Sequence, residues 1–351
     1  MSNGEAVAAF ERAFGEYVGA RYAIALCNGT ATLHTALMAL GVQPGDRVAV
    51  PPLTMSATTM AVLHAGAIPV FEDVDPQTWL LPIPEDFEAW PRGERSGVAA
   101  NIPVSLYGLH QPWRTQNTVD DAAQTLRPHG GCAFTSYSLQ YSKILALGEG
   151  GVLATNDEAL AIRARECSSL GYRLRADQPR IDSAILKSPT YARHWSYPSW
   201  NYRMNDLTAE EGLLGIEAGT TGFRWVDMEL ADRQKAAALY REASAGCSWL
   251  IPQHVPEGWT HDYWTYAVAA DTPERAVQLA DAIVRHGGER PYAAWLLTYD
   301  EPAFADLAPD AWTCPIAEDL QPRLLQFQTN SLSSATTNAD ALHRAIREIG
   351  G

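Results

Sequence analysis

The sequence predicts an α/β protein in which helices cover a mostly parallel sheet. Short apolar runs alternate with helical patterns from residue 5 to about residue 225, which is typical of this layered class. At 351 residues the chain exceeds the size at which a single hydrophobic core stops growing. The pattern changes near Phe223, where a long helical stretch begins. We therefore expect a larger domain over residues 1–225 and a smaller α+β domain over residues 226–351.

The larger domain is expected to open with an amphipathic helix, because Phe10, Phe14 and Val18 recur four residues apart. A buried strand over Tyr22–Leu26, a glycine turn and a helix over residues 32–40 follow. The remaining strand candidates are residues 48–50, 68–71, 98–104, 118–120, 132–138 and 151–155. Open α/β sheets bind ligands beyond the carboxyl ends of their strands, so residues that follow these runs are the first candidates for a site.

The smaller domain contains one helix with clear end signals. Thr272 is a preferred N-cap residue, Pro273 occupies the first helical position, and Gly287 follows the end. The other expected elements are a helix over residues 225–245, a strand over residues 263–270 and a closing helix over residues 338–349. Within the larger domain, residues 174–199 show little periodicity, and we interpret them as a long functional loop and not as a linker between domains.

Composition excludes several classes of partner. The net charge is -15, from 41 acidic and 26 basic side chains, so neither nucleic acid nor an anionic membrane surface is an expected ligand. The five cysteines form no CxxC pair, which argues against a zinc site or a disulfide framework and indicates reduced thiols. The first residues lack a basic segment followed by an apolar one, and no run approaches the ~20 apolar residues of a membrane span. We expect a cytoplasmic protein without bound metal.

Amine chemistry has few candidates, because the chain contains three lysines, Lys143, Lys187 and Lys235. Lys235 lies in a polar helical run and Lys187 in the irregular region, so both are expected to be solvated. Lys143 follows the apolar run 132–137 in a mainly uncharged stretch, where partial desolvation would lower its pKa and free the neutral amine. By itself this context fits either a Schiff-base lysine or a buried structural one.

Two further features occupy strand ends. Asn28, Gly29 and Thr30 join a strand to a helix, where free backbone N–H groups and the helix dipole favour an anion such as phosphate, although plain turn chemistry explains the same pattern. Asp120, Asp121 and Gln124 lie at the end of another strand, where one of the two carboxylates could hold a proton on a pyridine nitrogen or could simply interact with a helix dipole.

Along the chain, a possible phosphate-binding turn is followed by a possible ring carboxylate and then by Lys143. The same order occurs in a known family that this chain resembles. The chain resembles the DegT/DnrJ/EryC1/StrS family of sugar aminotransferases over nearly its whole length. The matching segments are NGTATLHTALMALGVQPGD, the run from AVPPLT to AGAIPVFEDVDP, IPVSLYG, VDDAAQ, SYSLQYSK, GEGGVLATND and NYRMNDLTAEEG. The resemblance implies a fold-type-I enzyme dependent on pyridoxal 5'-phosphate (PLP), with a mostly parallel seven-stranded sheet between helices.

The resemblance also implies roles for individual residues. Lys143 would form the Schiff base and move the proton, Asp121 would pair with the pyridine nitrogen, and Gln124 would lie beside the ring. The phosphate would be bound by the backbone of Gly29 and Thr30 and by the hydroxyl of Ser138. Asn201 would reach the phosphate of a neighbouring subunit, which implies a homodimer with shared active sites.

Three positions depart from the family pattern. Met55 stands where an aromatic residue usually stacks on the ring, and a thioether covers a ring more loosely. Ser105 and Gln140 stand where histidine is frequent.

The expected reaction is transfer of an amino group from glutamate or glutamine to the ketone of a sugar, a cyclitol or a related small compound. Two alternatives stay open: another PLP reaction on this scaffold, such as the dehydration carried out by aminohydroxybenzoate synthases, and a non-catalytic PLP-binding partner protein. A nucleotide-linked acceptor would need cationic residues for its pyrophosphate, and no convincing cluster stands out, which favours an acceptor without a nucleotide. The nearest candidates are Arg173, Arg175, Arg193 and Arg203.

Overall fold

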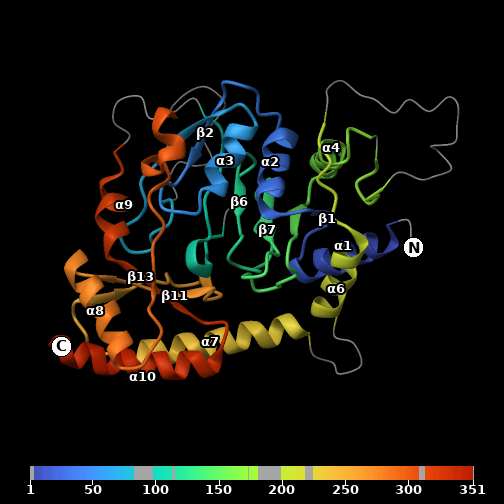
Figure 1. The fold of residues 1–351 in the computed structure, drawn as a ribbon. Coiled ribbons are helices and arrows are strands. Elements are labelled where there is room, and N and C mark those ends of the chain that lie inside the picture. The colour runs from blue at the N-terminus through green and yellow to red at the C-terminus, as the bar shows by residue number, and fades with distance from the viewer. Residues whose placement is uncertain are drawn as a thin grey trace, which may run out of the picture.

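The computed structural model describes residues 4–82, 98–112, 115–172, 174–180, 199–217, 224–307 and 313–350. A central sheet with helices on both faces occupies the N-terminal part, and the C-terminal elements pack at one end of it (Figure 1). Most of the predicted irregular loop, residues 181–198, lies outside the described residues.

The central sheet is built from two ladders. One has the order β3 (Ile68–Phe71), β2 (Arg47–Val50) and β4 (Val98–Asn101), and the other has the order β6 (Val119–Asp121), β7 (Phe134–Ser138), β8 (Gly151–Thr155) and β1 (Tyr22–Leu26). Parallel bridges from Asn101 to Thr118 and from Val104 to Asp121 join the ladders into one seven-stranded sheet. Only β8 runs antiparallel to its neighbours among these described strands, so the predicted mostly parallel sheet is confirmed.

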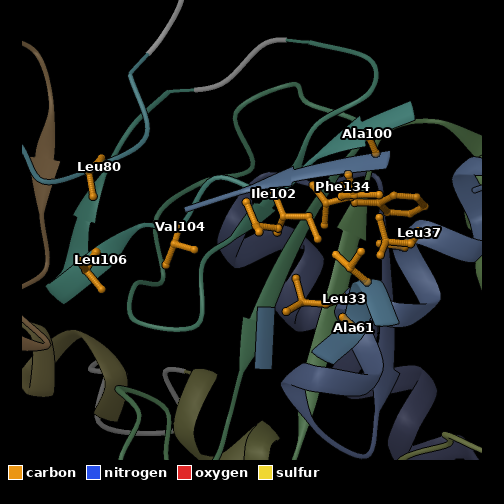
Figure 2. Close-up of a cluster of buried hydrophobic side chains, with 14 of the residues drawn as sticks. Leu33, Leu37, Ala61, Leu80, Ala100, Ile102, Val104, Leu106 and Phe134 are labelled. Atoms are coloured by element: carbon orange, nitrogen blue, oxygen red, sulfur yellow. The ribbon is translucent and has the colours of Figure 1, made fainter. Parts of the chain in front are cut away.

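Helices cover both faces of this sheet because its strands are apolar on both sides. On one face lie α2 (Gly29–Leu40), α3 (Ala57–His64) and α4 (Glu158–Ser168), and on the other lie α1 (Glu5–Val18) and α6 (Asp206–Ile216). Strand β1 shows the alternation: Ile24 and Leu26 enter the first core, and Ala23 and Ala25 enter the second. In Figure 2, Leu33 and Leu37 of α2 lie beside Phe134 of β7 in the first core.

The C-terminal part contains a second sheet, with the order β12 (Tyr292–Ala293), β13 (Leu324–Gln328), β11 (Thr265–Ala270) and β9 (Leu250–Pro252). Its strands are all antiparallel. Helices α7 (Trp225–Ala243), α8 (Pro273–Arg285) and α10 (Leu332–Ile349) pack on one face, and α7 and α10 lie side by side in Figure 1. Helix α7 begins at Trp225, next to the boundary predicted between residues 225 and 226. We propose that the smaller domain starts at this helix.

The smaller elements connect these parts. They are β5 (Leu109–His110), β10 (Thr260–His261), α9 (Pro315–Leu320) and short 3-10 helices at Leu106–Gly108, Thr298–Asp300, Pro302–Leu307 and Gln321–Arg323. Strands β5 and β10 pair with each other, which ties the N-terminal part to the C-terminal part. Within the described residues, no helix has the length and apolar content needed to cross a membrane.

Helix ends explain the main differences from the sequence prediction. The first turn of α2 begins at Gly29 instead of Thr32, because the side chain of Asn28 accepts a hydrogen bond from the amide of Ala31. Helix α10 begins at Leu332, six residues before the predicted start, because Ser331 caps it in the same way through Ser334. Helix α8 has the predicted Thr272 cap.

Candidate active site

The carboxyl ends of the central strands open into a cavity of about 470 Å³. Seven of the predicted site residues line it: Gly29, Thr30, Met55, Asp121, Gln124, Ser138 and Lys143. These residues come from four segments that are far apart in the sequence, so the parallel strands bring them together as open α/β sheets do.

One end of the cavity is formed by the first turn of α2. Gly29 and Thr30 are its first two helical residues, so their amides have no intrahelical partner, and the positive end of the helix dipole lies at the same place. A side chain at position 29 would crowd Ser138, because its Cβ would lie 3.0 Å from the Cβ of Ser138. Glycine therefore lets the amides approach the Ser138 hydroxyl, and together they form a set of donors for an anion.

Asp121 lies at the end of β6 and is 5% exposed. Its Oδ2 accepts a 2.8 Å hydrogen bond from the hydroxyl of Thr58. Burial raises the pKa of this carboxyl, while the bonds from Thr58 and the Ala123 amide and the charge of Lys143 oppose the rise. The neighbouring Asp120 is absent from the cavity lining and accepts a 3.2 Å bond from the hydroxyl of Ser105.

Gln124 is buried beside the same cavity, and its Oε1 accepts a hydrogen bond from the amide of Tyr107. Tyr107 has a φ of 62°, in the left-handed region that a bulky residue seldom adopts. The bond to Gln124 holds this turn against the cavity wall. Met55 is 49% exposed at the cavity edge, and its thioether accepts a 3.1 Å bond from the amide of Ala57.

Lys143 lies in the turn after β7, where its amide donates to the carbonyl of Gln140. Its Nζ is 4.5 Å from the centre of the Trp264 ring. Desolvation lowers the pKa of Lys143 to about 8, against the opposing influence of Asp121. An amine with this pKa has a much larger neutral fraction near neutral pH than an ordinary lysine has, and the neutral form is the one that a nucleophile requires.

Among the residues of this cavity that the sequence interpretation missed are Thr58, Trp264 and Trp295. Thr58 lies four residues after the PPLT segment, so that motif was the signal that could have found it. Trp264 and Trp295 come from the C-terminal part, and their sequence surroundings carry no motif that points to the cavity.

Asn201 does not line this cavity. It lies with Arg180 and Arg203 in a separate cavity of about 430 Å³. Its predicted role concerned the site of a neighbouring subunit, and its position away from the cavity of its own chain is compatible with that role. Arg175 is exposed and paired with Asp177, while Arg173 and Arg193 lie outside the described residues.

Comparison with known proteins identifies the family. The model of the DegT/DnrJ/EryC1/StrS aminotransferase family matches residues 1–341. The chain belongs to this family. The aminotransferase is 33% identical over 290 residues to a GDP-perosamine synthase of Caulobacter vibrioides, covering 76% of this chain and 70% of the relative.

Two other relatives agree with this assignment. An L-glutamine:2-deoxy-scyllo-inosose aminotransferase of Streptomyces fradiae is 32% identical over 286 residues, covering 77% of this chain and 63% of the relative. A crystal structure of a DegT DnrJ EryC1 StrS aminotransferase from Brucella abortus has a TM-score of 0.78 at 26% identity and covers 99% of this chain and 91% of that one.

The chain is therefore a PLP-dependent aminotransferase, and its cavity fits the cofactor. PLP has three groups that need different partners: a phosphate, an aldehyde and a pyridine nitrogen. The first turn of α2 with Ser138 offers donors for the anion, Lys143 offers an amine, and Asp121 offers a carboxylate. The three partners face one cavity, as a single small molecule requires.

Proposed function

We propose that this aminotransferase moves an amino group from glutamate or glutamine to the ketone of a sugar or cyclitol. The observation that carries the proposal is the convergence of Lys143, Asp121 and the first turn of α2 on one cavity. The names of the relatives support the acceptor class, because one is an aminosugar synthase and another aminates an inosose. The second name also supports glutamine as the donor.

Lys143 is proposed as the residue that links to the cofactor and moves the proton of the reaction. PLP, when bound, supplies the electron sink that this proton transfer needs. The lowered pKa suits both tasks, because linkage to the cofactor would require the neutral amine, and the same amine, once the amino group of the donor has replaced it on the cofactor, could accept and return a proton near neutral pH. The indole of Trp264 shields the amine on one side.

Asp121 is proposed to hold a proton on the pyridine nitrogen. Its hydrogen bond from Thr58 fixes the carboxylate on the cavity side of β6. Gln124 is proposed to lie beside the ring, and Met55 to cover it. Gly29, Thr30 and Ser138 are proposed to bind the phosphate, and hydrogen bonds to a charged group such as this phosphate each contribute roughly 1.5–3 kcal/mol.

The proposed working unit is a homodimer in which Asn201 donates to the phosphate in the partner's site. Two observations support it: the site lacks Asn201 of its own chain, and Asn201 lies in a polar cavity with two arginines.

The alternatives are a different PLP reaction, such as dehydration, and a non-catalytic PLP-binding protein. Lys143, Asp121 and Gln124 are all present and face one cavity, which favours catalysis over binding alone. Transamination differs from dehydration because the nitrogen of the donor appears in the product.

The test follows the cofactor spectrum of the purified protein. A Schiff-base lysine should give a band near ~420 nm, typical of this cofactor chemistry, which glutamate or glutamine removes and a keto-sugar or cyclitol ketone restores. Lys143→Ala should abolish the band, and Lys235→Ala should keep it, because Lys235 is exposed and paired with Asp232. Borohydride trapping on Lys187 or Lys235 would refute the site, and a band that no donor removes would refute transamination.

A further inference from the structure

A second cavity, of about 390 Å³, adjoins the first at its lysine end. The two cavities share Ser142, Trp264 and Trp295 as walls. The indoles of Trp264 and Trp295 are stacked with their centres 6.2 Å apart and their planes at 17°. Lys143 lines the first cavity, and its Nζ lies 4.5 Å from the ring of Trp264, one of the shared walls, so a molecule in the second cavity contacts the same indole as the amine does.

The floor of this cavity is the polar face of the C-terminal sheet. Along β13, Leu325 and Phe327 enter the core with the helices, and Gln326 and Gln328 point to the opposite face. Thr265 of β11 pairs with Gln328, and Tyr292 of β12 pairs with Gln326, so these four side chains share one face.

Two of these four polar side chains, Thr265 and Gln326, are buried, whereas Gln328 is half-buried and Tyr292 is exposed. Thr265 is 6% exposed, and its hydroxyl has no hydrogen-bond partner among the described residues, although it lines the cavity. A buried hydroxyl without a partner destabilises the fold, because it has lost its hydrogen bonds to water and gained none in return. A ligand that forms a hydrogen bond with Thr265 would remove this cost. The amide of Gln326 donates to the carbonyl of Ala293, and the amide of Gln328 donates to the hydroxyl of Tyr292, which fixes both side chains. The wall thus presents fixed amides and a free hydroxyl.

The cavity offers no free positive charge. Among the described residues that line it, Arg233 is the one charged side chain, and it is buried. Its guanidinium donates to the Glu229 carboxylate, to the carbonyl of Trp264 and to the hydroxyl of Thr329. A paired, fully engaged guanidinium cannot neutralise a phosphate or carboxylate, so an anionic ligand would lose its hydration without compensation.

We propose that the second cavity binds the ring of the amino acceptor, and that this acceptor is a neutral polyhydroxylated ring without a nucleotide. The indole pair covers the C–H surface of the ring, while Thr265, Gln326 and Gln328 bind its hydroxyls. Amide and hydroxyl groups suit such a ligand because each can donate and accept. The inference rests on the proposed function, since the ketone of a ring bound here would have to reach the adjoining cavity that Lys143 lines.

The test is calorimetric titration of the holoenzyme with scyllo-inositol, a neutral ring polyol that lacks a ketone and cannot react, and with UDP-glucose. We expect saturable binding of scyllo-inositol that weakens about tenfold in Thr265→Val and in Gln328→Leu. Gln278→Leu, on the exposed side of α8, is the matched control and should bind as the unchanged protein does. Thermal unfolding of each variant shows that it is folded, and Gln328, which is only half-buried, serves if Thr265→Val is unstable.

Removal of the ~420 nm band by glutamine or glutamate, a readout of the cofactor chemistry, is recorded on the same samples. If the band is never removed, the proposed function fails independently of ring binding. If the band is removed but scyllo-inositol does not bind, or binds equally well to both cavity variants, the acceptor pocket is refuted. UDP-glucose binding tenfold or more tightly than scyllo-inositol would refute the absence of a nucleotide.

Discussion

Nζ of Lys143 lies 4.5 Å from the centre of the Trp264 indole, although the two residues come from different parts of the chain. The indole is held by its own contacts: its Nε1 donates a 2.7 Å hydrogen bond to the carbonyl of Ser142, and its backbone carbonyl accepts from Arg233. The ring face therefore has a fixed position against the amine. A cation in such a position is stabilised by the ring quadrupole.

Replacing Trp264 should lower turnover through its effect on the Lys143 amine, with a smaller effect on the stability of the fold. Trp264→Leu removes the ring face, which at this kind of site is worth roughly 0.5–2 kcal/mol to the ammonium that Lys143 forms when it accepts the proton of the reaction, so turnover should fall by about tenfold. Trp264→Phe keeps a ring and should retain most of the activity. Steady-state kcat and cofactor content of both variants provide the measurement. Equal loss in the two variants would show that the indole N–H, instead of the ring face, matters.

Asp121→Asn should keep the bound cofactor and lose most of the turnover. Removing one fixed electrostatic group typically costs ~2.7–4 kcal/mol, or about 10²–10³ in rate. Asp120→Asn is the matched control: burial raises the pKa of Asp120 to about 8, so its side chain is mainly protonated at neutral pH and an amide resembles it. The measurement is single-turnover conversion with glutamate. A larger loss in Asp120→Asn than in Asp121→Asn would reassign the role.

Cofactor uptake should depend on pH through Lys143. Its pKa is lowered to about 8 from the 10.5 of an unperturbed lysine, and the neutral amine is the reactive form. The rate at which apoenzyme takes up PLP should therefore rise with pH up to about 8 and level off above it. Asp121 favours the ammonium, so Asp121→Asn should shift the midpoint to lower pH. Borohydride trapping at timed intervals measures the rate, and a midpoint near 10 would contradict the desolvated site.

Activity should require two subunits. Asn201→Ala should weaken cofactor retention by roughly 1.5–3 kcal/mol, the value of a charge-assisted bond to phosphate. Mixing Asn201→Ala with Lys143→Ala subunits should restore part of the activity, because one site of the heterodimer then combines an intact lysine with the asparagine of its neighbour. Activity of the mixture, with subunit exchange shown separately, is the measurement. A fully active monomer would exclude shared sites.

The local features of the cavity could be predicted from the sequence. The scarcity of lysine is a matter of composition. The strand ends at Asp121 and Ser138 and the first turn of α2 are properties of short segments. They depend on hydrogen bonds and burial patterns within a few residues, and a parallel sheet then places all strand ends along one edge. Even so, the helix start at Gly29 required the Asn28 cap, which the apolar pattern alone did not reveal.

The sequence by itself determined the family, the sheet and the residues expected to hold the cofactor, because each of these is written in contiguous motifs. Only the tertiary structure decided which side chains from the C-terminal part meet Lys143. Trp264, Trp295, Thr265 and the glutamines of β13 reach the site because strands β11, β12 and β13 pack their second face toward the central sheet. Their position depends on pairing between strands that are about 30 to 60 residues apart in the sequence. A motif spans only a few contiguous residues and therefore could not predict this pairing.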